Sequence, residues 1–158
     1  MQPSRPQAGW RYSSSGIVMT DPKNPIPQGD YIPAIRNGNL IYTSGMTPRR
    51  EGVLILTGPV RTAAPLETYR EAVTLACANA LTAARSVLSD GEQIGAILSL
   101  TVYVAAEPGY TEHAKVADIA SVYLRSALGA KGIGTRAAIG VATLPGNAPV
   151  EIQLVAAV

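Results

Sequence analysis

Phenylalanine is absent from this chain of 158 residues, and cysteine, histidine and tryptophan each occur once. A single cysteine, Cys77, cannot form a disulfide within the chain, which is typical of a reducing compartment, so we expect a cytoplasmic location. One cysteine and one histidine, His113, cannot supply the ligands of a thiolate or imidazole metal cluster. The sequence therefore argues against a disulfide-stapled fold and against this class of metal centre.

Charge is also scarce, because charged residues make up 15% of the chain and hydrophobic residues 47%. This balance is typical of one folded domain and not of a disordered tail. The net charge is +2 and only Arg49 and Arg50 are adjacent basic residues, so we expect no binding to nucleic acid or to a membrane surface. No apolar run approaches the roughly 20 residues of a membrane span. The first ten residues lack the apolar stretch of a signal peptide, so export is not expected.

Proline and glycine divide the chain into an N-terminal arm, residues 1–28, and a domain, residues 29–158. The arm is rich in Pro, Ser and Gln up to residue 15, and three prolines between residues 21 and 30 exclude regular structure there. Within the arm we predict only a short strand at Gly16–Thr20. The arm is therefore expected to be partly irregular.

The domain alternates between apolar runs and helical periodicity. Apolar residues recur every three or four positions over Pro65–Ser89 and again over Thr111–Leu128, which predicts two helices. Two strands are expected within residues 31–45, joined at Asn37-Gly38, a dipeptide that tolerates a tight hairpin turn. The remaining expected strands are Val53–Thr57, Ile97–Ala105, Arg136–Thr143 and Val150–Ala157, and the last two are neighbours if Leu144–Pro149 is a simple hairpin connection.

Two helices can cover only one face of such a sheet. The strands Ile97–Ala105 and 136–142 nevertheless carry small or apolar residues at both alternating sets of positions, as strands buried on both faces do. The second face therefore needs a cover, and other copies of the chain in closed symmetry supply one.

Three polar residues stand out against the apolar strands. The guanidinium of Arg136 requires an anion, which is either a carboxylate of the same chain or the carboxylate of a ligand. Glu151 either pairs with a base or positions a water molecule and moves a proton. Ser44 either caps a strand end or offers its hydroxyl to a ligand, but no His or Lys is placed to activate it as a nucleophile.

Other residues have simpler expectations. Tyr31 is expected in the core or at its rim, and Arg36 and Asn37 in solvent at the turn. His113 lacks the spacing of a Ser–His–Asp triad, and we expect it at the surface or in an interface. Cys77 lies on the apolar side of a helix, where a thiol packs and does not react.

Several segments together resemble the Rid family of reactive-intermediate (enamine/imine) deaminases, also called the YjgF or L-PSP family. The resemblance covers residues 29–158, and its most specific element is the pattern R-x(7)-LP-x(4)-VEI, which runs from Arg136 to Glu151. The other segments are GDYIPAIRNGNLIYTSGMTP, CANAL and LTVYVA. The N-terminal part, the YTEHAKVAD segment and the CANAL helix indicate a divergent branch.

The resemblance implies an α+β, chorismate-mutase-like fold, with two helices on one face of a mixed sheet of about six strands. It also implies a homotrimer whose sheets line a central barrel, with ligand clefts between neighbouring subunits. The implied partners are other copies of the chain and a small carboxylate substrate.

The implied reaction is hydrolysis of an enamine or imine to a 2-oxo acid and ammonia, without a metal or an organic cofactor. Arg136 would hold the substrate carboxylate, and so orient the carbon–nitrogen double bond, while Glu151 would position the attacking water. Tyr31, Ser44 and Gly45 match residues that line the family's pocket.

Three positions depart from the family pattern. Ala138 stands where the archetype has cysteine, Met46 replaces glutamine in the SGQ motif, and the asparagine of the second helix falls near Ala117. His113 or Lys115 would then occupy that part of the pocket, and the implied substrate is larger or specific to a pathway. Two other functions stay open: a non-catalytic trimer that binds or shields metabolites, and RNA cleavage, against which the near-neutral charge weighs.

Overall fold

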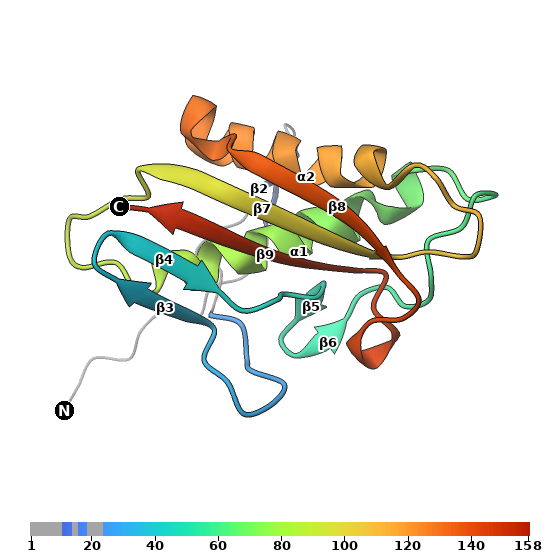
Figure 1. Ribbon diagram of the computed structural model, residues 1–158, viewed down its shortest axis with the longest axis horizontal. Coiled ribbons are helices and arrows are strands. Elements are labelled where there is room, and N and C mark those ends of the chain that lie inside the picture. The colour runs from blue at the N-terminus through green and yellow to red at the C-terminus, as the bar shows by residue number, and fades with distance from the viewer. Residues whose placement is uncertain (1–10, 14–15, 19–23) are drawn as a thin grey trace.

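The computed structural model describes residues 11–13, 16–18 and 24–158. Its main body is a five-stranded sheet with two helices packed on one face (Figure 1). In chain order the elements are β1 (Arg11–Ser13), β2 (Gly16–Val18), β3 (Ala34–Asn37), β4 (Leu40–Thr43), β5 (Arg49–Arg50), β6 (Val53–Leu54), α1 (Glu67–Arg85), β7 (Ala96–Ala105), α2 (His113–Leu128), the 3₁₀ turn η1 (Gly129–Gly132), β8 (Thr135–Val141), the 3₁₀ turn η2 (Pro145–Asn147) and β9 (Val150–Ala157).

The strand order in the main sheet is β3-β4-β9-β7-β8, and only the β7–β8 pair is parallel. The predicted hairpin between the last two strands is therefore wrong, because β8 and β9 lie on opposite sides of β7. The connection around η2 crosses the end of β7 and spans two strand spacings, about 10 Å. β7, with ten residues and a nearly apolar sequence, is hydrogen-bonded to a neighbouring strand on each edge in this order.

The strand expected at Val53–Thr57 is only partly formed. Val53–Leu54 pairs with Arg49–Arg50 in a separate two-stranded ribbon, so the main sheet has five strands and not about six. The cause is a tight turn at Glu51 and Gly52, both with positive φ (51° and 84°), which folds the chain back on itself. Near the N-terminus β1 pairs antiparallel with β2, so a strand also forms within the expected arm, whose other residues up to 23 lie outside the described part.

The two predicted helices are confirmed, each somewhat shorter than expected. α1 begins two residues after Pro65 and ends at Arg85, and α2 begins at His113. Alternate residues of β9 point into the core against the helices: Val150, Ile152, Leu154 and Ala156. α1 is rich in alanine, and its alanines are buried in the core between the helices and the sheet.

The other face of the sheet carries exposed apolar side chains. Ile35 is 56% exposed, Tyr42 45% and Ile139 40%. Both helices lie behind the sheet in the view of Figure 1, so within the described residues no helix covers this face, as the sequence predicts. None of the helices in the described ranges is long and apolar enough to cross a bilayer.

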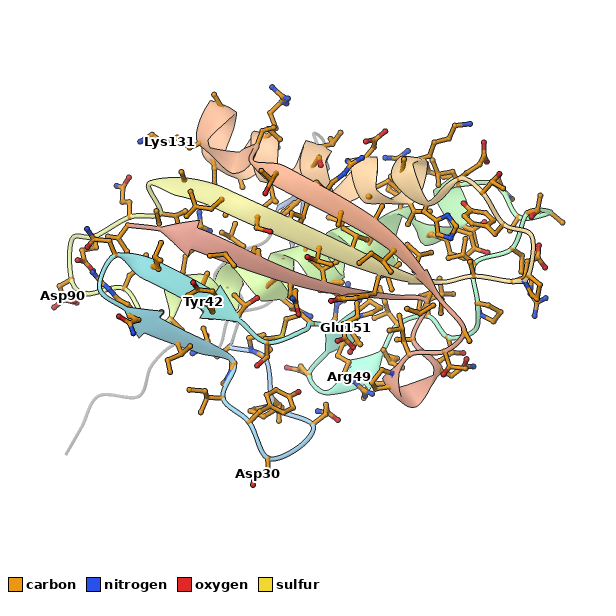
Figure 2. All side chains as sticks on the ribbon, viewed as in Figure 1. Asp30, Tyr42, Arg49, Asp90, Lys131 and Glu151 are labelled. Carbon is orange, nitrogen blue, oxygen red and sulfur yellow. The ribbon has the colours of Figure 1, made fainter. Side chains whose placement is uncertain are left out.

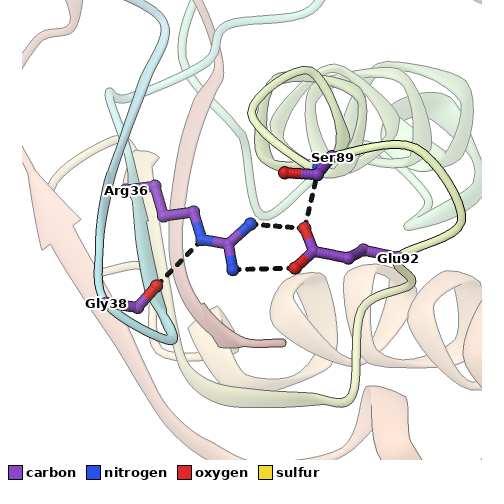
Figure 3. A network of polar contacts seen from close by, with 4 residues as sticks. All are labelled: Arg36, Gly38, Ser89 and Glu92. Carbon is purple, nitrogen blue, oxygen red and sulfur yellow. Dashed lines mark hydrogen bonds and ion pairs between the residues drawn. The ribbon is translucent and has the colours of Figure 1, made fainter.

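The Arg36 side chain is not free in solvent at the turn, contrary to the expectation from the sequence. Its guanidinium forms a two-bond ion pair with the carboxylate of Glu92, and its Nε donates to the carbonyl of Gly38 at 2.8 Å (Figure 3). The backbone N–H of Ser89 also donates to Glu92, at 2.7 Å. These contacts tie the β3–β4 hairpin to the segment between α1 and β7, and they lower the pKa of Glu92 to about 2.

Candidate active site

Glu151 and Gly45 form the first part of the candidate site. Thr43 lies beside Leu154 and Met46 pairs with Ile152, so residues 44 and 45 together face one residue of β9 and form a bulge. The Glu151 carboxylate lies directly against Gly45, and any Cβ on Gly45 would overlap with Glu151 Oε1. Figure 2 shows Glu151 near the start of β9. Glycine is therefore required here for close approach.

The Glu151 carboxylate is partly buried, and no polar contact among the described residues replaces the water that it loses. Within the described residues it makes no hydrogen bond and no ion pair, and burial raises its pKa above the usual value for a glutamate. Desolvation disfavours the charged form in this way and makes the carboxylate a better proton acceptor than a solvated one. The alternative of an internal ion pair for Glu151 thus finds no partner among the described residues.

Two more predicted residues lie beside this glycine. Ser44 Oγ donates to the carbonyl of Ile32 at 2.7 Å, and the Ser44 N–H donates to Pro33 at 2.9 Å. The segment that contains Tyr31 therefore runs alongside Ser44 and Gly45. Tyr31 is 42% exposed, so it lies at the rim, and its hydroxyl accepts a hydrogen bond from Gln28 N–H at 3.0 Å.

The segment after Gly45 is fixed by a residue that the sequence did not single out. Asn79, 8% exposed in α1, donates from Nδ2 to the carbonyls of Thr47 (3.2 Å) and Arg49 (2.9 Å). A lone asparagine in an alanine-rich helix is the signal that points to such a contact, because a buried amide requires partners.

Arg136 lies elsewhere, on the edge strand β8. It is in register with Leu100, a core residue, so it points toward the helix side of the sheet. Its Nη1 donates to Asp118 Oδ1 at 2.7 Å and to Ser121 Oγ at 3.0 Å, both on α2. The internal carboxylate considered as an alternative therefore exists. However, the Asp118 side chain is 64% exposed, and it occupies only one nitrogen of the guanidinium.

His113 and Ala138 share this side of β8 with Arg136. The His113 imidazole lies over Gly140, where a Cβ would come within 2.5 Å of Nε2, and the Tyr110 ring meets it edge-on at 5.3 Å. Ala138 is partly buried against the core between Gly140 and Arg136. His113 is thus next to the strand that carries Arg136, at the opposite end of it.

Within one chain the predicted site residues lie in two separate groups. Arg136 is in register with Leu100 and Glu151 with Tyr103, three positions apart on β7, or about 10 Å along the strand. The alternation of side chains also places them on opposite faces of the sheet. The first group comprises Tyr31, Ser44, Gly45 and Glu151, and the second comprises His113, Ala138 and Arg136.

The described residues contain no cluster of three or more His, Cys, Asp or Glu side chains that could hold a metal ion. The polar groups in the two groups of residues are the carboxylate of Glu151, the hydroxyls of Tyr31 and Ser44, the guanidinium of Arg136 and the imidazole of His113.

Comparison with known proteins identifies the family. The family model described as "Endoribonuclease L-PSP" matches residues 22–158. Protein TCP17 of Trypanosoma cruzi is 30% identical over 129 residues, which are 80% of each chain. The crystal structure of Atu1372 from Agrobacterium tumefaciens, a protein of unknown function, is 33% identical over 82% of each chain, with a TM-score of 0.76. A putative endoribonuclease from Shewanella oneidensis MR-1 is 25% identical and has a TM-score of 0.79 over 87% of this chain and 91% of that one. The predicted fold is thus confirmed, and the chain belongs to the endoribonuclease L-PSP (YjgF) family.

Proposed function

We propose that this protein hydrolyses an enamine or imine acid to a 2-oxo acid and ammonia, in a cleft where Glu151 of one protomer meets Arg136 of another. The observation that carries the proposal is Glu151. It is a partly buried carboxylate with no partner among the described residues, held against a glycine and with a raised pKa.

The reaction divides into two tasks. Arg136 binds the substrate carboxylate and so fixes the neighbouring carbon–nitrogen double bond. An enamine first gains a proton from solvent on carbon and becomes an iminium. Glu151 then takes a proton from water as the water oxygen attacks the iminium carbon. Glu151 returns this proton to the nitrogen of the resulting amino alcohol, and the carbon–nitrogen bond breaks to release ammonia. The hydroxyl group loses its proton to solvent and becomes the carbonyl of the 2-oxo acid.

The separation of the two groups within one chain supports a cleft between chains. Arg136 and Glu151 lie on opposite faces and two strands apart, so a small substrate held by Arg136 does not reach Glu151 of the same protomer. A neighbouring protomer on the exposed apolar face would bring its own edge strand, and with it Arg136, toward Glu151. The assembly therefore forms part of the proposal.

The direct test generates 2-aminoacrylate in solution and follows the release of ammonia with and without the purified protein. The wild type is expected to accelerate release, and Arg136→Ala and Glu151→Gln to abolish most of the acceleration. Arg70→Ala and Glu67→Gln, which alter an exposed ion pair on α1, serve as the matched controls and should remain active. Equal acceleration by wild type and Arg136→Ala, or none by the wild type across several imino acids, would contradict the proposal.

The same samples distinguish the competing functions. Binding of 2-oxo acids by the wild type without turnover would favour a non-catalytic binding protein. The name of the family and that of the Shewanella oneidensis relative favour a test for RNA cleavage as well. One chain has a single histidine and cannot supply a catalytic pair by itself, which weighs against RNA cleavage, and metal-free RNA degradation by a highly purified sample would favour it.

A further inference from the structure

The hydrogen bonds of Arg136 occupy one end of its guanidinium and leave the other end open. Nη1 donates one hydrogen to Asp118 Oδ1 and one to Ser121 Oγ, at 2.7 and 3.0 Å, so both of its hydrogens are used. Within the described part of the chain, Nε and Nη2 have no hydrogen-bond partner. These two nitrogens form the side of the fork that binds a planar carboxylate with two parallel bonds.

The two partners come from the register of α2 against β8. His113 lies over Gly140, and Ser121 contacts Arg136, so the helix runs antiparallel to the strand. Four residues of a helix advance about 6 Å and two residues of a strand advance about 6.6 Å. Helix residues four apart therefore stay beside strand residues two apart along the contact. A fixed helix therefore presents Asp118 and Ser121 to Arg136 together.

We propose that Asp118 and Ser121 are positioning residues, which hold Nη1 of Arg136 so that Nε and Nη2 face the substrate carboxylate. This inference rests on the proposed function. It assigns the Asp118 contact an orienting role and not a neutralising one.

The solvent exposure of the ion pair between Arg136 and Asp118 supports this assignment. The Arg136 side chain is 26% exposed and that of Asp118 64%, so water screens the ion pair and it contributes little to stability. Ser121 carries no charge and cannot neutralise the arginine at all. What both contacts have in common is that they restrict the rotation of a long side chain.

Orientation and charge have opposite effects on carboxylate binding. Freezing a flexible side chain on binding costs roughly twofold to tenfold in affinity, and a side chain fixed beforehand avoids this loss. The negative charge of Asp118 repels an incoming carboxylate, which weakens binding about twofold at an exposed site. Asparagine at position 118 removes the charge but keeps the acceptor oxygen, whereas alanine removes both.

The test is calorimetric titration of the full-length protein with 2-oxobutyrate as the probe. Ser121→Ala is expected to weaken binding about threefold without any change of charge. Asp118→Ala should bind about fivefold more weakly than Asp118→Asn, and Asp118→Asn at least as tightly as the wild type. Glu67→Ala is the matched control, because it removes an exposed helical acid that pairs with Arg70, and its binding should not change. Equal melting temperatures would show that each variant is folded.

The inference is overturned if Ser121→Ala binds like the wild type, or if Asp118→Ala binds as tightly as Asp118→Asn. Arg136→Ala separates this outcome from failure of the proposed function. If Arg136→Ala abolishes binding while the positioning variants have no effect, only the inference fails. If Arg136→Ala binds normally, or if the wild type does not bind the probe, the proposed function fails and the inference with it.

Discussion

At the scale of single residues, the contact between Gly45 and Glu151 determines where the carboxylate lies. Gly45 follows the β4 strand in a bulge, and the carboxylate fills the space that a side chain would take. Sequence motifs identified both residues. The contact between them depends on the bulge, which no local pattern in the sequence indicates.

Gly45→Ala is therefore expected to displace the Glu151 carboxylate. A misplacement of about 1 Å lowers a catalysed rate by about 100-fold, and overpacking costs about 1–3 kcal/mol of stability. Ammonia release and thermal unfolding measure the two effects. In the Gly45→Ala background, Glu151→Gln should cause little further loss of rate, because the displaced carboxylate no longer contributes to catalysis and its removal changes little. Fully additive losses would show that the two residues act separately.

The raised pKa of Glu151 predicts the pH dependence of the reaction. The carboxylate must be ionised to accept a proton, so kcat/KM should rise with pH, with its midpoint above the pKa of 4.5 of an ordinary glutamate. Stability should change in the opposite sense. Because burial disfavours the charged form, the stabilising effect of a protonated Glu151 is lost as pH rises through the raised pKa. Wild type should thus lose melting temperature relative to Glu151→Gln over that range, and parallel curves would contradict this.

At the scale of elements, the Arg36–Glu92 ion pair connects the first hairpin to the segment before β7. The lowered pKa of Glu92 means that its contribution is complete above the unfolded value near 4.5 and is lost as pH falls toward about 2. Glu92→Gln should therefore destabilise the protein at pH 7 and make little difference at pH 2. Thermal unfolding at both pH values measures this, with Glu67→Gln as the control for an exposed helical pair. The same deficit at both pH values would show that the ion pair is not the cause.

Local patterns predicted the helices well and the strand neighbours poorly. The periodicity over α1 and α2 is contained within each segment, so the sequence alone predicts both helices to within a few residues at each end. The position of β9 between β4 and β7 depends on contacts far apart in the sequence, and a hairpin was therefore the wrong expectation. For the same reason the sequence indicated a need for an anion at Arg136 but not that Asp118 and Ser121 would contact it.

At the scale of the whole molecule, the apolar sheet face leads us to expect that copies of the chain associate, and the family resemblance implies that there are three of them. Burying a lysine there would be costly, so Tyr42→Lys should shift the protein toward monomers and lower its activity. Sedimentation velocity over a range of protein concentrations measures this. Val122→Lys, on the outer side of α2 and 62% exposed, is the matched control and should leave the assembly intact. A wild type that remains monomeric at high concentration would leave the proposed cleft without its second chain.

The one thiol of the protein has a consequence for experiments on it. Cys77 is fully buried, its Sγ lies 3.7 Å from the carbonyl oxygen of Ala120, and burial raises its pKa. Alkylating reagents attack the thiolate, so the folded protein is nearly inert toward them. A cysteine introduced at an exposed position would consequently carry a fluorophore or spin label alone, with no need to remove the native residue first.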